Sequence, residues 1–162
     1  MSMNTNYGYE TPSGVPGGIY DLSPHTVNSR ITGSAGVSLG IGVVQGTSKG
    51  TEIVVPTSGS TEATFEGVTL NSFSHEMEKD GKVIIQKGAT LEVMNQGKVW
   101  VKVSKNAKDV GYGVSANLVL SGDEVGFFTT AADTTTESKL ALTKVKFITA
   151  VSDGIAVVEI GK

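Results

Sequence analysis

The chain has 162 residues, no cysteine and a formal net charge of −3, so disulfide bonds and thiolate chemistry are excluded and a strongly basic surface for nucleic acid is missing. It holds no run of about 18 apolar residues, and we therefore expect no transmembrane helix and no membrane partner. Met1–Glu10 has neither the basic region nor the apolar core of a signal peptide, so export by that route is not expected.

Residues 1–25 differ in composition from the rest of the chain, and we predict an extended N-terminal arm there, followed by a single β-rich domain over residues 26–162. Between Tyr7 and Tyr20 the segment is rich in glycine and proline, which suit neither a helix nor a central strand. Such a segment is either a disordered tail or an arm that orders against a partner. Because tyrosine combines a large contact area with a polar tip, we predict partner contacts from Tyr7, Tyr9, Ile19 and Tyr20.

Beyond Pro24 short apolar stretches alternate with turn signals, and 21 residues of the chain are glycine. This spacing predicts an all-β fold, either an antiparallel β-barrel or a sandwich of short strands. A turn is predicted at Asn95–Gly97, a weak helical piece at Ser72–Lys79 and a polar loop over Thr129–Ser138. The predicted strands are Val37–Val44, Thr51–Pro56, Glu62–Leu70, Lys82–Lys87, Ala89–Met94, Lys98–Ser104, Val114–Leu120, Glu124–Thr130, Lys144–Val151 and Gly154–Ile160.

The strand predicted at Lys98–Ser104 alternates strictly, with three valines on one face and Trp100 between two lysines on the other. Tryptophan is enriched where proteins bind one another, so Trp100 is a candidate contact residue for a partner or a second protomer. The alternative is that both faces of this strand are covered by the chain itself while the lysines extend to solvent.

No motif for catalysis, a cofactor or a metal is found in the sequence. Gly40–Gly46 resembles a dinucleotide fingerprint, but a strand pattern follows it where the motif requires a helix N-terminus. His25 and His75 lie far apart and have no metal-ligand spacing, and Asp133 beside a turn is expected to accept hydrogen bonds from local amides. We therefore predict a non-enzymatic protein without cofactor or metal.

An ordered set of motifs over roughly residues 23–160 resembles the structural cement (capsid decoration) proteins of tailed bacteriophages. The motifs that carry the resemblance are Ser23–Ser29, Gly40–Thr47, Phe65–Leu70, Gly97–Val103, Gly122-Asp123 and Gly154–Ile160. The resemblance implies a β-rich protein on the outer surface of the virion that binds the major capsid protein and stabilises its lattice, commonly as a homotrimer. Such a protein is made in the host cytoplasm, and the role of the arm is our own inference beyond the resemblance.

Two other functions stay open at this point. A tail- or fibre-associated module that binds carbohydrate or a receptor would need an exposed aromatic platform, for which Trp100, Phe127 and Phe128 are the candidates. A trimeric nucleotide hydrolase of β-rich fold is faintly suggested by Asp109–Gly113, although the acidic and glycine motifs expected around it are missing.

Overall fold

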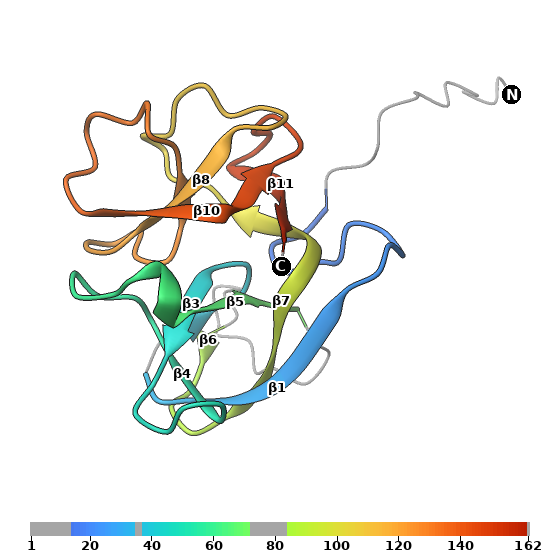
Figure 1. Cartoon of the computed structure of the whole chain (residues 1–162), viewed down its shortest axis with the longest axis vertical. Helices are drawn as coiled ribbons and strands as arrows, with labels where there is room; N and C mark the ends of the chain where they lie inside the picture. Colours follow the sequence, from blue (N-terminus) through green and yellow to red (C-terminus); the bar gives the residue numbers. More distant parts are fainter. Residues whose placement is uncertain (1–13, 35–36, 72–83, 162) are drawn as a thin grey trace, which may run out of the picture.

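The computed structural model describes residues 14–34, 37–71 and 84–161, with the backbone alone for Ile84. It confirms the predicted all-β class, since the regular elements in these ranges are strands apart from one short 3-10 turn, η1 (Glu62–Thr64) (Figure 1). The strands are β1 (Thr26–Thr32), β2 (Val37–Ser38), β3 (Gly42–Gln45), β4 (Glu52–Val54), β5 (Phe65–Thr69), β6 (Ile84–Ile85), β7 (Thr90–Lys102), β8 (Ser115–Val119), β9 (Phe128–Thr129), β10 (Lys139–Phe147) and β11 (Ile155–Ile160).

Five of these strands close into a barrel. Their order is β1-β4-β3-β5-β7, and β7 pairs again with β1, which completes the ring. The β1–β7 pair is antiparallel and runs from Thr26 opposite Gln96 to Ile31 opposite Thr90. The β1–β4 pair is parallel and involves only Ile31 and Thr32 of β1. Closure removes most free edges of a sheet, but within the described residues the first part of β1 pairs with a strand on one side alone.

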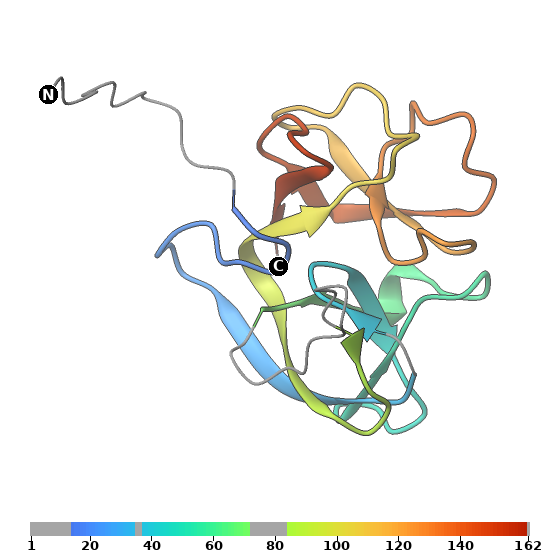
Figure 2. The ribbon, with the colours of Figure 1, turned by 180° about the vertical axis from the view of Figure 1, so that it is seen from behind.

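A second group of strands continues from the same β7. β11 pairs with the second half of β7, from Gly97 to Lys102, and β10, β8 and β9 follow in that order. The two ribbon views show the barrel and this second sheet as two lobes with β7 running between them (Figures 1 and 2). β7 is therefore the element that joins the two halves of the protein.

The predicted turn at Asn95–Gly97 is wrong, because β7 is continuous through these residues. Gly97 has a φ of +128°, and a Cβ atom at this position would lie 2.6 Å from the Cβ of His25. The glycine thus permits a close approach inside a strand rather than a reversal of the chain. On one side of β7 the pairing with β5 ends at Met94 and the pairing with β11 begins at Gly97, while β1 pairs with the other side up to Gln96.

Each lobe has its own apolar core. The barrel encloses Val37, Leu39, Ile41, Val43, Ile53, Ile85, Leu91 and Val93. The larger cluster lies mainly beneath the second sheet and contains Val68, Leu70, Met94, Val99, Val101, Val103, Ala116, Leu118, Phe128, Leu142, Val145, Phe147, Ala156, Val158 and Ile160. Burial of one such large side chain contributes about 1.5–3 kcal/mol to folding, so the two clusters stabilise both ends of β7.

Other differences concern the ends of elements. β1 is a strand that the sequence pattern did not predict, since of its side chains Thr32 alone is fully buried. β10 begins at Lys139 and ends at Phe147, earlier than predicted, and the polar loop ends where β10 begins. The first part of the predicted strand Glu62–Leu70 is the turn η1. The helical piece predicted at Ser72–Lys79 lies outside the described residues.

Candidate interface

Residues 14–24, here called the N-terminal segment, lie along the second half of β7. The backbone N–H of Trp100 donates to the Gly18 carbonyl over 2.9 Å, and the backbone carbonyl of Trp100 accepts from the Gly17 N–H over 2.8 Å. The Tyr20 N–H donates to the Lys98 carbonyl of β7 over 3.1 Å. These three bonds extend the sheet by one short, irregular strand. The segment therefore covers the edge of β7 that faces away from β11.

Trp100 is the centre of this contact. Its ring meets that of Tyr20 edge to face, with centroids 5.9 Å apart and planes inclined by 64°. Gly14 lies against the indole so closely that an added Cβ would be 2.2 Å from the indole nitrogen. Trp100 is half-buried under residues of its own chain. Its immediate role in this structure is thus to hold the N-terminal segment against β7.

The N-terminal segment carries three exposed aliphatic side chains. Val15 is 55% exposed, Ile19 45% and Leu22 97%. Within the described residues, large hydrophobic side chains this exposed are otherwise isolated at Ile31, Tyr112 and Val151. Single exposed apolar residues are ordinary on protein surfaces, but these three lie within eight residues of one segment, which makes that segment the candidate interaction site. We call Val15, Ile19 and Leu22 the apolar row.

The residues predicted from the sequence to contact a partner fall into three groups. Tyr7 and Tyr9 lie outside the described residues. Ile19 belongs to the apolar row and is open to solvent, while Tyr20 and Trp100 pack on each other beneath it. Val15 and Leu22 were missed. The sequence could have indicated them, because a segment rich in glycine and proline forms no core that would bury its large aliphatic residues.

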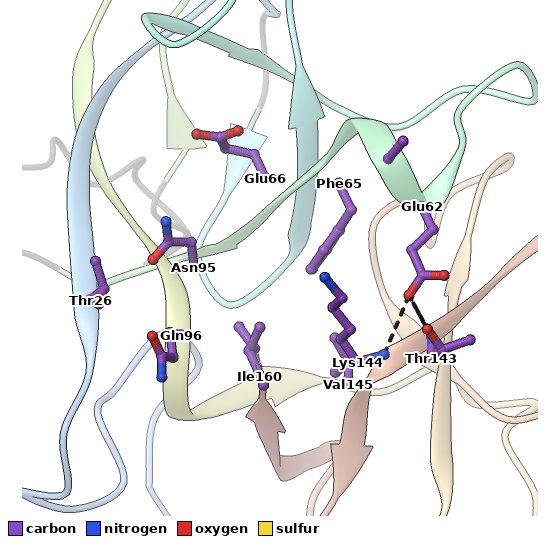
Figure 3. Close-up of a pocket in the computed structure, with 12 residues that line it drawn as sticks. Thr26, Glu62, Phe65, Glu66, Asn95, Gln96, Thr143, Lys144, Val145 and Ile160 are labelled. Carbon is purple, nitrogen blue, oxygen red and sulfur yellow. Dashed lines mark hydrogen bonds between the residues drawn. The ribbon is translucent and has the colours of Figure 1, made fainter.

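A cleft of about 630 Å³ opens where the two lobes part (Figure 3). It forms because β5 and β11 pair with the same side of β7 and separate near Asn95 and Gln96. Both apolar and polar side chains line it. The lining residues are Thr26, Glu62, Ala63, Phe65, Glu66, Asn95, Gln96, Thr143, Lys144, Val145, Ile160 and Gly161.

Glu62 bridges the two lobes at the rim of this cleft. Its Oε1 atom accepts hydrogen bonds from the Thr143 N–H at 2.6 Å and the Thr143 hydroxyl at 2.8 Å, and a longer one from the Lys144 N–H. These donors favour the charged form, so the pKa of Glu62 lies below its usual range although burial acts in the opposite direction. Glu62 thus ties η1 of the barrel lobe to β10 of the second sheet.

Glu66 is engaged in a similar way inside the barrel lobe. Its Oε1 atom lies 2.7 Å from the Arg30 guanidinium, and its Oε2 atom accepts from the Gln45 amide at 3.4 Å. The three residues come from β5, β1 and β3, and they connect strands that do not all pair directly. Glu62 and Glu66 thus both have internal partners at this cleft, and Glu62 joins the two lobes there.

Asp133 is almost fully buried in the loop before β10. Burial acts to raise its pKa, but hydrogen bonds from the Thr136 and Thr135 amides and the Thr129 hydroxyl hold the pKa well below its usual range. The Lys139 ammonium donates to the Asp133 carbonyl. The expectation that Asp133 accepts from local amides is therefore confirmed, and its role is to order the loop.

Other kinds of site receive no support from the structure. No group of histidine or acidic residues in the described ranges could hold a metal ion, and no helix of the described chain is long and apolar enough to cross a membrane. The aromatic platform for sugar stacking is contradicted, because Phe128 is completely buried and Trp100 is covered by the N-terminal segment.

One of the comparisons with known proteins identifies a family. A family model described as "Structural cement protein (E217 gp24/Pam3 gp6)" matches residues 3–161. The comparison with curated proteins found no match. Among solved structures, a chain of "The capsid of Myoviridae Phage XM1" is 21% identical, with a TM-score of 0.74 over 100% of this chain and 99% of that chain. At this identity the structural likeness speaks for the fold.

Proposed function

From the premise that this chain belongs to the family of structural cement proteins, we propose that it binds the outer surface of a phage head by direct contact with the major capsid protein. The family makes the chain a component of the virion with a structural, capsid-stabilising role. The observation that carries the proposal is the family match, because it extends over nearly the whole chain, including the N-terminal segment.

The apolar row is the part of the described surface that best suits this contact. Val15, Ile19 and Leu22 gain free energy when a partner removes them from water, at roughly 25 cal/mol per Å² of apolar surface. The backbone of residues between Val15 and Leu22 is already hydrogen-bonded to β7, through Gly17, Gly18 and Tyr20, so little conformational entropy is lost when the row docks. Tyr20 and Trp100 support the row from beneath, while Tyr7 and Tyr9 add contacts further along the arm.

Stabilisation follows from mass action. A protein that binds the assembled shell, and has no affinity for free capsid subunits, favours the assembled state by RT ln(1 + [L]/Kd). Bridging two or more subunits gives this effect at each junction of a shell that is under pressure from packaged DNA. We propose that the protein acts as a homotrimer after synthesis in the host cytoplasm, so that each assembly grips several capsid subunits at once.

The test is co-sedimentation of purified protein with filled heads that lack it. We expect saturable binding with a fixed ratio of protein to capsid subunit, and a higher temperature for DNA release from decorated heads. Heads that stay bare at saturating protein concentration would contradict the proposal. Binding to empty shells and to free DNA should be measured in parallel, because binding to DNA alone would equally contradict an outer-surface role.

A further inference from the structure

A bulge in β7 lies at the cleft between the two lobes. In the register of β7 with β1, Gln96 is opposite Thr26 and Met94 is opposite Val27, so Asn95 is the extra residue. Side chains of a strand alternate between its two faces, and the extra residue of a bulge breaks this alternation. Asn95 and Gln96 are consecutive, and yet both line the cleft. The bulge thus brings two neighbouring carboxamides to one site.

These two carboxamides are available to a ligand. Within the described part of the chain, neither the Asn95 nor the Gln96 side chain has a hydrogen-bond partner, and Figure 3 draws both of them at the cleft. On the side of β7 that carries β5 and β11, the register with β5 ends before these residues and the register with β11 begins after them. Each carboxamide offers two N–H donors and one acceptor oxygen. The site therefore presents polar groups where strand pairing is interrupted.

Apolar surface lies next to the carboxamides. It is supplied by Phe65, Val145 and Ile160, which come from β5, β10 and β11. The cleft volume of about 630 Å³ falls within the roughly 300–1,000 Å³ of sites that bind small ligands. A sugar stacks on an exposed aromatic face, whereas Phe65 is half-buried and packs against the larger core cluster. This surface therefore suits an aliphatic side chain better than a sugar.

The charges at the cleft balance one another. Glu66 is paired with Arg30 at 2.7 Å. The Lys144 ammonium attracts the Glu62 carboxylate, which also accepts two hydrogen bonds from Thr143. A charged ligand would either compete for these partners or stay unpaired itself, and both cost free energy. The cleft therefore favours a ligand without net charge.

A peptide segment meets all of these requirements. Its N–H and C=O groups match the acceptor and donors of a carboxamide, and an extended segment gains main-chain hydrogen bonds where a strand lacks a neighbour. We propose that the cleft binds an extended, uncharged peptide segment of a second partner protein. The backbone of the segment lies on the carboxamides of Asn95 and Gln96, and an aliphatic side chain lies on the apolar surface.

This binding goes beyond the proposed function. The lining of the cleft includes no residue of the N-terminal segment, so docking of the apolar row on the shell uses none of the groups that would hold the peptide. The cleft gives the protein a second contact, with a partner other than the surface on which the apolar row docks.

NMR titration of the isotope-labelled full chain tests the proposal. The probe is the blocked peptide acetyl-Ser-Thr-Leu-Thr-Ser-amide. We expect saturable shifts of the side-chain NH₂ signals of Asn95 and Gln96 and of the backbone amide of Gly161, which also lines the cleft. The same peptide with lysine or aspartate in place of leucine should bind at least ten-fold more weakly, and maltotriose should leave these signals unchanged.

A double variant shows whether the carboxamides carry the binding. Asn95→Ala with Gln96→Ala should weaken peptide binding at least ten-fold, read from the Gly161 amide, while the rest of the spectrum keeps the dispersion of the folded protein. The matched control is Gln86→Ala with Asn106→Ala, which removes the same two kinds of side chain outside the cleft. It should bind like wild type.

Three results would overturn the proposal: no shift at the cleft up to the solubility of the leucine peptide, equal affinity of the two double variants, or a preference for maltotriose or a charged peptide. Binding to heads is measured separately by co-sedimentation. Decorated heads together with a cleft that ignores the peptide would refute this inference and leave the proposed function intact, whereas bare heads would contradict the proposed function alone.

Discussion

In the two lobes the large apolar side chains point inward, and Phe128, Phe147, Ile41 and Leu91 are among those that solvent barely reaches. In the N-terminal segment the aliphatic side chains point outward, up to the 97% exposure of Leu22. Both regions use β7 as their support. The difference suggests a division of roles, in which the lobes supply stability and the N-terminal segment supplies contact. Substitutions in each region test whether the roles are divided in this way.

The largest effect on stability should come from the core of the second sheet. Phe147→Ala empties a fully buried site, and we expect the free energy of unfolding to fall by about 3–5 kcal/mol. Urea denaturation measures it directly. Leu22→Ala is the comparison, since a surface substitution of this kind usually changes stability by less than about 0.5 kcal/mol. Similar losses for both variants would refute the division of roles.

The second largest effect on stability is expected at Asp133. Asp133→Asn removes the charge that three hydrogen bonds stabilise, and we expect a loss of roughly 1–3 kcal/mol at neutral pH. Because the folded pKa lies below the unfolded value, the charged group contributes stability above about pH 4 and loses it as pH falls further. The difference between wild type and variant should therefore shrink below pH 4. A constant difference from pH 7 to pH 3 would contradict the account.

A smaller effect is expected where the N-terminal segment meets Trp100. Gly14→Ala places a methyl group against the indole and should loosen the segment while leaving both cores intact, at a cost of about 1 kcal/mol or less. Trp100 is the single tryptophan of the chain, so its emission should shift to the red as water reaches it. Gly59→Ala, where an added Cβ meets little, is the control. An unchanged spectrum for Gly14→Ala would show that the segment does not depend on this contact.

The smallest effect on stability should accompany the largest effect on binding. Ile19→Asp and Leu22→Asp place a charge on the apolar row, and we expect unfolding midpoints close to wild type but at least ten-fold weaker binding to heads. Val151→Asp is matched to Ile19→Asp, because the two side chains are 41% and 45% exposed. Equal binding to heads by all three variants would show that the apolar row is not part of the interface.

The sequence predicted best where one face of a strand is buried. The strict alternation after Lys98 identified the second half of β7 because its valines point into a core. β1 was not predicted, because it is a strand through its pairing with other strands and has no buried face that the sequence pattern could reveal. The turn at Asn95–Gly97 was inferred from glycine next to polar residues. The positive φ of Gly97 and the close approach of His25 explain why a glycine is needed inside the strand.

For the interface, residue type predicted Ile19, Tyr20 and Trp100 as candidates, but not their arrangement. Whether an aromatic residue is exposed or covered depends on which distant segment packs on it, and Gly14 and Trp100 are far apart in the sequence. The boundary between arm and domain at residue 25 stays a prediction, as do contacts from Tyr7 and Tyr9.

The most direct test of the central claim is a cryo-electron microscopy map of heads that lack the protein and are then saturated with it. We expect density at regular positions on the outer shell, with the apolar row of residues 15–22 against capsid protein and the barrel lobe held away from it. A map in which the barrel or the second sheet makes the contact, while the N-terminal segment faces solvent, would contradict the account.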